Sequence, residues 1–137
     1  MPRLQGRATV ECIIVKKQGE FRLSDGSTSS EAILTIVLDG YHAPLTSGNF
    51  LDLVVRKFYN QMPIQAVDEL FVKTGKPTNL EDGKIDGFID PSTKEKRSIP
   101  LELFYKKDRE TTYGYTSDDD MRATESFVLP FQAYVRI

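Results

Sequence analysis

Few side chains in this sequence could do chemistry, and their spacing argues against an independent catalytic centre. His42 is the only histidine and Cys12 the only cysteine among the 137 residues. A zinc site needs a cluster of Cys and His ligands, which the chain does not offer. A serine relay through His42 would need a second plausible base. We therefore predict that His42 is a polar loop residue, that Cys12 is a small buried core residue, and that the chain holds neither metal nor cofactor.

Two short runs of charge are the remaining candidates. Asp118, Asp119 and Asp120 are adjacent in the sequence, whereas the carboxylates of a helix-loop-helix calcium site alternate with other residues. A solvated acidic loop is the favoured interpretation. The basic stretch from Lys94 to Arg97 is also interpreted as a solvated loop, with a docking patch as the alternative.

The elements that must position these residues begin with two strands. Residues Arg7 to Val15 and Ala32 to Leu38 are rich in β-branched and apolar side chains and lack helical spacing. The second segment is almost continuously apolar, which predicts a strand buried on both faces or a central barrel strand. The polar segment between them predicts a hairpin turn or loop, with a short strand near Phe21 to Leu23.

One helix is predicted over residues 47–57. Pro44 disfavours helix at Ala43 just before it, and Thr46 or Ser47 can cap a helix that starts there. Residues three or four apart form one face of this helix: Phe50, Leu53, Val54 and Lys57. We expect this largely apolar stripe to plug or cover the end of a barrel.

Shorter strands are predicted in the second half, separated by long polar stretches at 75–100 and 106–124. They are Ile64–Val67, Leu70–Lys73, Ile99–Phe104 and Ser126–Ile137. Strands, one helix and further strands favour a mainly β barrel and disfavour a doubly wound α/β sheet. The length predicts a single domain spanning residues 1–137.

Two groups of motifs carry a family resemblance. The first combines Pro44, Thr46, Asn49 and Phe50 with the pair Phe58-Tyr59, and it resembles the helix motif of the cyclophilin family of prolyl isomerases. The second consists of D-G-Y-x-A-P at residues 39–44, G-F-I-D-P-S-T at 87–93 and I-P-L-E at 99–102. These stretches, and the insertion that contains the middle one, resemble the large thylakoid-lumen cyclophilins of plants and algae.

The resemblance implies a fold and an activity. The family fold is an eight-stranded antiparallel β-barrel capped by two helices, with a shallow groove that binds a proline peptide. Rotation about the peptide bond is opposed by a barrier of roughly 18–20 kcal/mol. In the family, an arginine donor near the proline nitrogen stabilises the twisted amide electrostatically.

The groove positions implied by the resemblance have lost their polar roles. Ala66 occupies the arginine position, and Leu70 the position of the groove phenylalanine. Lys73 replaces a glutamine. The full set of vestigial groove positions is Ala66, Leu70, Phe71, Lys73, Phe131 and Gln132. Loss of one such donor typically costs on the order of 10²–10³ in rate. We therefore predict no catalytic residue.

The later part of the family barrel has no counterpart here, since the sequence stops at Ile137 and contains no tryptophan. We expect a barrel that lacks its C-terminal part and exposes strand edges, which a bound protein would cover. The leading hypothesis is a non-catalytic binding or assembly subunit of a larger membrane-associated complex, such as a photosystem, in the chloroplast thylakoid lumen. The alternatives are an active prolyl isomerase or foldase, and a peptide-binding chaperone without turnover.

The bulk composition limits other functions. Hydrophobic residues make up 39% and charged residues 28%, which is typical of a globular chain. A net charge of −2 and a pI of about 5.4 argue against a nucleic-acid partner. No apolar run approaches the roughly 20 residues of a membrane span, and no targeting segment is visible.

Overall fold

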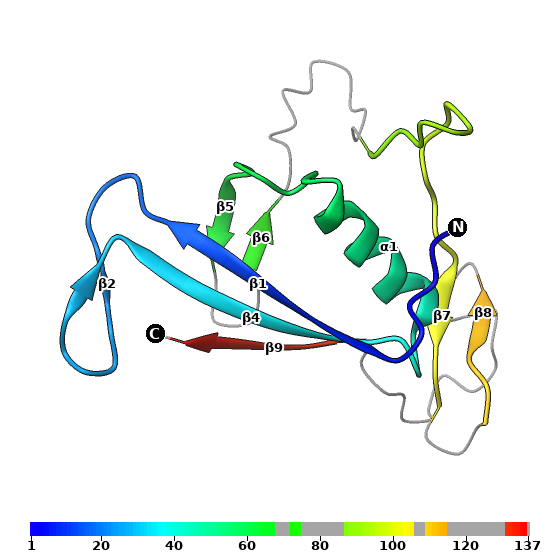
Figure 1. The fold of residues 1–137 in the computed structure, drawn as a ribbon, viewed down its shortest axis with the longest axis horizontal. Helices are drawn as coiled ribbons and strands as arrows, with labels where there is room; N and C mark the ends of the chain where they lie inside the picture. Colours follow the sequence, from blue (N-terminus) through cyan, green and yellow to red (C-terminus); the bar gives the residue numbers. More distant parts are fainter. Residues whose placement is uncertain (68–71, 75–86, 106–108, 115–130, 137) are drawn as a thin grey trace. The chain divides into compact units, whose positions relative to one another are not determined.

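The computed structural model describes residues 1–67, 72–74, 87–105, 109–114 and 131–136 (Figure 1). The chain forms two compact units. One comprises Met1–Asp52 with Pro100–Ile137, and the other comprises Leu53–Ile99. Each unit is described by itself.

A three-stranded antiparallel sheet organises the first unit. Strand β4 (Glu31–Asp39) lies in its centre, between β1 (Arg7–Val15) and β9 (Phe131–Arg136). The strands β1 and β4 pair along nine residues, from Arg7 opposite Asp39 to Val15 opposite Glu31. Both strands follow the apolar, β-branched segments of the sequence, and β4 is the central strand of this open sheet.

Along β1 and β4, the side chains that the structure describes as buried lie on one face of the sheet. Val10, Ala32 and Leu38 are buried and belong to the core of the unit. On the other face, Ile33 remains 45% exposed, so β4 is not buried on both faces along its whole length. Cys12 is only half-buried, so the prediction that it is a core residue is wrong. Burial still raises the pKa of its thiol.

The helix α1 (Pro44–Val55) begins three residues earlier than predicted. Proline is well tolerated at the first helical position because its missing N–H has no partner there in any case. The helix also ends before the predicted boundary at Lys57, whose φ of 60° is left-handed. The N–H of Lys57 donates to Val54 and that of Phe58 to Leu53, which is the pattern of a Schellman C-terminus.

The described part of the first unit also contains two small antiparallel pairs. The strands β2 (Phe21–Arg22) and β3 (Thr28–Ser29) form a hairpin, which confirms the short strand predicted near Phe21. The strands β7 (Leu101–Leu103) and β8 (Thr112–Gly114) pair with Leu101 opposite Gly114. The sequence predicted only a polar stretch where β8 lies, because three residues are too few to show a period.

The described part of the second unit contains two hairpins. The strands β5 (Ile64–Val67) and β6 (Val72–Thr74) pair antiparallel, with an irregularity in register between Ile64 and Ala66. The other hairpin lies within the segment 87–97 and has one bridge, between Ile89 and Lys96. The described residues are thus mainly β with a single helix, as the sequence predicted, and their strands form one three-stranded and three two-stranded sheets that do not close into a barrel.

Candidate functional site

Two of the predicted groove positions face each other across the β5–β6 hairpin. Ala66 lies on β5 and its Cα pairs with that of Lys73 on β6. Leu70 and Phe71, which come between the two strands, lie outside the described residues. The backbone therefore places two of the predicted groove positions, Ala66 and Lys73, at a shared rung of the hairpin.

Two further groove positions begin strand β9 in the other unit. Phe131 pairs with Leu38 of β4, and Gln132 pairs with Val37. This antiparallel register places Phe131 opposite a fully buried leucine, at the end of β4 that leads into α1.

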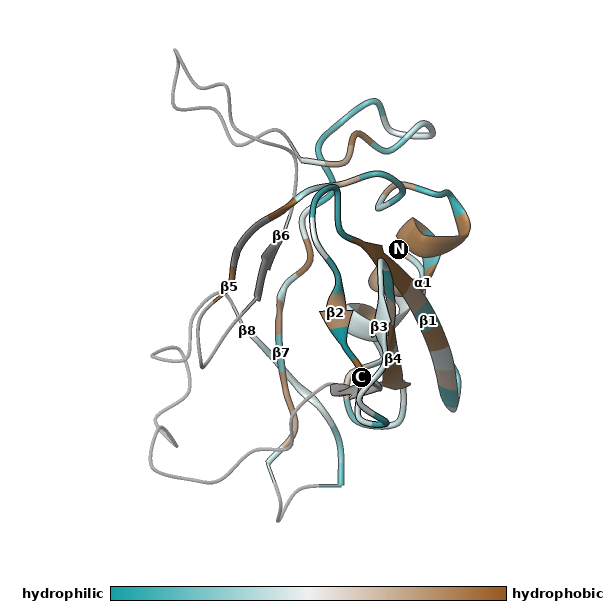
Figure 2. Ribbon diagram, turned by 90° about the vertical axis from the view of Figure 1, so that its left-hand side faces the viewer, coloured by the Kyte–Doolittle hydropathy of each residue, from teal (hydrophilic) through white to brown (hydrophobic). Residues whose placement is uncertain are grey.

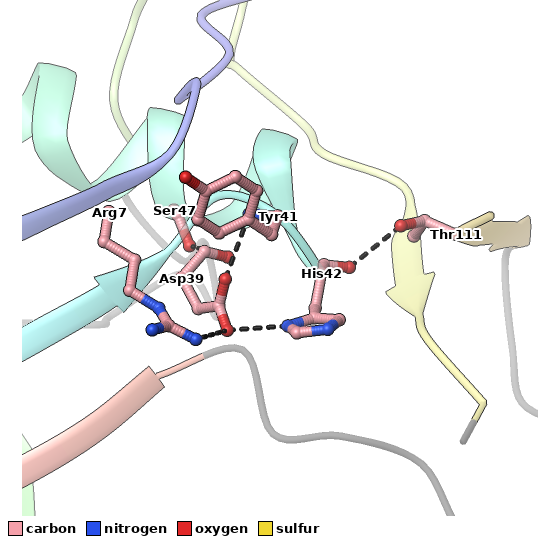
Figure 3. A network of polar contacts seen from close by, with 6 residues as sticks. All are labelled: Arg7, Asp39, Tyr41, His42, Ser47 and Thr111. Atoms are coloured by element: carbon pink, nitrogen blue, oxygen red, sulfur yellow. Dashed lines mark hydrogen bonds and ion pairs between the residues drawn. The ribbon is translucent and has the colours of Figure 1, made fainter. Parts of the chain in front are cut away.

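A network of polar contacts surrounds Asp39, the last residue of β4 (Figure 3). Its Oδ2 lies 2.6 Å from Nδ1 of His42 and 3.5 Å from the Arg7 guanidinium, and its Oδ1 accepts the backbone N–H of Tyr41 at 3.0 Å. Partial burial alone would raise the pKa of Asp39. The hydrogen bonds from His42 and Tyr41 and the nearby Arg7 outweigh it and hold that pKa below its usual value. Asp39 is therefore an ionised anchor for the turn.

His42 is held by this network from several sides. Its ring lies edge-on against Phe104, with centroids 4.5 Å apart, and its carbonyl accepts the hydroxyl of Thr111 at 2.9 Å. A serine relay would direct a hydroxyl at the imidazole. Here the Ser47 hydroxyl donates to the backbone carbonyl of Asp39 at 3.1 Å. The network therefore holds the turn between β4 and α1, and His42 is a loop residue, as predicted.

A buried carboxylate caps the N-terminus of α1. Glu102, at the centre of β7, is buried, and its two oxygens accept the backbone N–H groups of Leu45 at 2.9 Å and Thr46 at 2.7 Å. These donors have no partner within the helix, and a negative charge is favourable at this end. The cap predicted from Thr46 or Ser47 is therefore supplied by a residue 57 positions after Leu45.

Side chains within the hairpin at 87–97 pack against one another. Both Nε and Nη2 of Arg97 donate to Oδ2 of Asp90, at 3.1 and 2.7 Å, and the guanidinium lies 4.6 Å from the centre of the Phe88 ring. The arginine side chain is only 7% exposed. The prediction of a solvated basic stretch is therefore correct for Lys94 and Lys96, which are exposed, and wrong for Arg97.

The sequence contains signals for Glu102 and Asp90, although their structural roles were not predicted from it. Glu102 lies between two leucines in a predicted strand, and an acid in such a position needs buried donors. Asp90 precedes Pro-Ser-Thr, a typical turn sequence in which the carboxylate accepts the N–H two residues ahead. Neither signal identifies the partner. The partners of Glu102 are remote in the sequence, and Arg97, the partner of Asp90, lies across the hairpin turn.

Metal binding and membrane spanning find no support within the described segments. Those segments contain no group of three or more His, Cys, Asp or Glu side chains placed to hold a metal ion. They also contain no helix with the length and apolarity needed to cross a membrane. The acidic run 118–120 lies outside them.

The mainly β architecture with a single helix, together with the sequence motifs, is consistent with a cyclophilin-type domain. Residues 24–128 match the family model described as "Cyclophilin type peptidyl-prolyl cis-trans isomerase/CLD". The chain belongs to this family, and the resemblance inferred from the motifs is confirmed.

Three relatives show which members it is similar to. It is 40% identical over 134 residues to the chloroplastic peptidyl-prolyl cis-trans isomerase CYP38 of Arabidopsis thaliana, covering 98% of this chain and 28% of that protein. It is 42% identical over 135 residues to a putative thylakoid lumen peptidyl-prolyl cis-trans isomerase of Synechocystis, covering 98% and 31%. It is 33% identical over 135 residues to chloroplastic CYP37 of Arabidopsis thaliana, covering 97% and 26%. The chain thus spans less than a third of the length of each.

Proposed function

We propose that this chain is a non-catalytic cyclophilin domain that binds partner proteins in the thylakoid lumen, as part of a larger membrane-associated complex such as a photosystem. The observation that carries the proposal is Ala66, at the position where the family motif has its arginine. The names of the three relatives, two chloroplastic and one of the thylakoid lumen, support the compartment.

The chemical argument concerns the amide nitrogen of the proline. As the X-Pro bond twists, this nitrogen loses conjugation and becomes a better hydrogen-bond acceptor. A preorganised donor lowers the barrier because it binds the twisted state more strongly than the planar one. The methyl group of an alanine supplies no such donor, so this chain has lost the differential binding that accelerates rotation.

The neighbouring position strengthens the argument. The partner of Ala66 across the hairpin is Lys73, where the family motif has glutamine. A glutamine amide can both donate and accept, whereas an ammonium group only donates. The replacement therefore removes the hydrogen-bond acceptor that the glutamine carbonyl would supply.

The direct test is a protease-coupled isomerisation assay with a proline peptide on the recombinant chain. We expect a rate equal to that of the buffer blank, with an active cyclophilin that retains the arginine measured in parallel. Cooperative urea unfolding of the same sample must show that the chain is folded. Robust turnover by the folded chain would overturn the proposal.

An active isomerase is the second candidate, because all three relatives are named as peptidyl-prolyl cis-trans isomerases. An active isomerase requires that a residue other than residue 66 supply the hydrogen-bond donor to the proline nitrogen. The two functions separate in one experiment, in which the substrate peptide is added to ¹⁵N-labelled chain. Exchange between the cis and trans resonances of the peptide indicates catalysis, and amide shifts without exchange indicate binding alone.

A further inference from the structure

The turn of the β2–β3 hairpin contains an Asp-Gly pair, Asp25-Gly26. This hairpin connects β1 to β4 and lies beyond the paired ends of both strands (Figure 1). The strands β2 and β3, which the structure describes in full, pair at two positions. Because so short a pairing opens locally at little cost in free energy, the turn can open while the main sheet stays folded.

In an Asp-Gly pair, the backbone can react with the neighbouring side chain. The glycine nitrogen attacks Cγ of the aspartate, so that a C–N bond forms and a C–O bond of the carboxyl group breaks. The nitrogen proton and the released hydroxyl leave together as water, and the product is a succinimide ring. Water then opens the ring at either carbonyl, which gives aspartate or isoaspartate. Glycine favours the attack because no Cβ hinders it.

The closed turn holds both reacting groups in other contacts. Oδ1 of Asp25 accepts the backbone N–H of Ser27 at 2.9 Å and its hydroxyl at 2.6 Å. These hydrogen bonds, the one from the hydroxyl first, hold the pKa of Asp25 below its usual value. An ionised carboxylate is a poor electrophile, because it has no hydroxyl to lose. The N–H of Gly26 donates to the Leu23 carbonyl at 3.0 Å. Opening of the turn releases both groups together.

The turn has little protection from outside itself. Asp25, Gly26 and Ser27 are all exposed, and a Cβ placed at Gly26 would have no neighbouring atom within 4 Å. The hydrogen bonds and charges that lower the pKa of Asp25 include no charged side chain. The reactivity of this pair therefore depends on local contacts within residues 23–27.

A second Asp-Gly pair, Asp39-Gly40, provides an internal comparison. Its carboxylate contacts Arg7 and His42, and the N–H of Gly40 donates to the Gly6 carbonyl at 2.8 Å. Gly40 is buried, and the pair lies at the end of the nine-residue pairing of β1 with β4. Freeing these groups requires the main sheet to separate, which is a much rarer event than the opening of a short hairpin.

We propose that Asp25-Gly26 is a modification site, at which the open β2–β3 turn forms a succinimide and then isoaspartate, and that the Ser27 contact sets the rate. Isoaspartate adds one carbon to the main chain, so the turn cannot close again with the same hydrogen bonds. The free α-carboxyl group of the product is the substrate of a carboxyl methyltransferase that uses S-adenosylmethionine. This inference goes beyond the proposed binding role and does not depend on isomerase activity.

The test follows isoaspartate in the intact chain during incubation in mildly acidic buffer, where more of the carboxyl group is neutral. Cleavage after glutamate then yields the peptide 21–31 with the first pair and the peptide 32–69 with the second. Isoaspartate is counted by transfer of a labelled methyl group from S-adenosylmethionine and located by electron-transfer fragmentation. We expect it to accumulate in the peptide 21–31 and to stay at the starting level in the peptide 32–69.

Two serine variants test the control by Ser27. Ser27→Ala removes the hydroxyl contact and is expected to raise the rate at Asp25 several-fold. Ser30→Ala makes the same change at an exposed serine of the same connection and should leave the rate unchanged. Equal rates in Ser27→Ala and the original chain, or an equal rise in both variants, would overturn the inference.

Incubation in urea separates the effect of the fold from that of the sequence. In the unfolded chain, the two Asp-Gly pairs are expected to react at similar rates, because neither keeps its contacts. If the unfolded chain retains the difference between them, the neighbouring residues set the rate and the inference is wrong. It is also wrong if the folded chain accumulates no isoaspartate at Asp25, or as much at Asp39 as at Asp25.

Discussion

At the scale of single residues, three charged side chains hold local structure in place through their hydrogen bonds. Glu102 caps a helix, Asp39 anchors a turn, and Arg97 closes a hairpin. A buried charge is costly unless it is hydrogen-bonded, and each of these is. Such residues stabilise the elements that carry a binding surface, and they need not contact a ligand themselves.

Replacing Glu102 tests the remote helix cap. We expect Glu102→Ala to lower the free energy of unfolding by about 2–4 kcal/mol, since each buried donor left without an acceptor costs roughly 1–3 kcal/mol. Glu102→Gln retains one accepting oxygen and should cost less. The measurement is urea unfolding, compared with Glu110→Gln at an exposed acid, which is expected to change little. Equal effects of Glu102→Ala and Glu110→Gln would contradict the cap.

The titration of Asp90 tests the hydrogen bonds that Ser92 and Arg97 donate to its carboxylate. Hydrogen bonds from the Ser92 hydroxyl and then from Arg97 hold the pKa of Asp90 well below its usual value. An unfolded aspartate titrates at about 3.9, so the stabilisation is fully present above that pH and is lost as the pH falls toward the lower folded value. An NMR titration should show the Asp90 carboxyl still ionised at about pH 3.9, where half of unperturbed aspartates are protonated.

Ser92→Ala is the matched variant for this titration. It removes the hydroxyl donor and should move the pKa of Asp90 upward, while Arg97 keeps it below the unperturbed value. A wild-type Asp90 that titrates like an unfolded aspartate, or one that Ser92→Ala leaves unchanged, would show that the hydrogen bonds do not form in solution.

At the scale of elements, the sequence predicted strands better than it predicted boundaries and caps. The long strand β1 lies where its apolar pattern places it, and β4 extends one residue further at each end than predicted. The helix start was misplaced because its cap comes from β7, far along the chain, and no local pattern reports a remote carboxylate. The groove position Ala66 came only from the family motif, since an alanine carries no chemical signal of its own.

Two glycines explain how the first six residues pack. A Cβ at Gly48 on α1 would lie 2.7 Å from the backbone N of Leu4 and 2.7 Å from the carbonyl oxygen of Pro2. A Cβ at Gly40 would collide with the backbone of Leu4 as well. The Leu4 N–H donates to the Pro44 carbonyl at 3.0 Å. The N-terminal segment therefore packs backbone to backbone on the helix start.

Gly48→Ala is predicted to destabilise the chain. Alanine favours an isolated helix by about 1 kcal/mol over glycine, but overpacking against fixed backbone costs roughly 1–3 kcal/mol. In a variant without residues 1–4, the same substitution should instead stabilise by about 1 kcal/mol, because only the helix propensity remains. Both values come from urea unfolding. The same sign of effect in the two backgrounds would refute the packing.

At the scale of the whole molecule, several apolar side chains described on one face of the β1–β4 pair are exposed to solvent. Ile13 is 66% exposed, Val15 is 59% exposed, and Ile13 pairs with the half-exposed Ile33 across β1 and β4. Figure 2 shows apolar stretches along both strands. Adjacent exposed apolar residues on a sheet are uncommon in a protein that works alone, since they favour association. This face supports a binding role independently of Ala66.

Self-association of the isolated chain is therefore the expected behaviour, and one substitution should reduce it. Ile13→Lys places a charge in the middle of the exposed face, where it opposes the stacking of two such faces and lies at a position that needs no burial. Light scattering after size-exclusion chromatography should show a larger monomer fraction for Ile13→Lys than for the original chain.

Val55→Lys is the control, since Val55 is 73% exposed on α1 and lies on no sheet face. If Val55→Lys restores the monomer equally, general charge rather than the β1–β4 face governs association. If the original chain is already monomeric throughout, this face does not drive association and its exposure gives no support to a binding role.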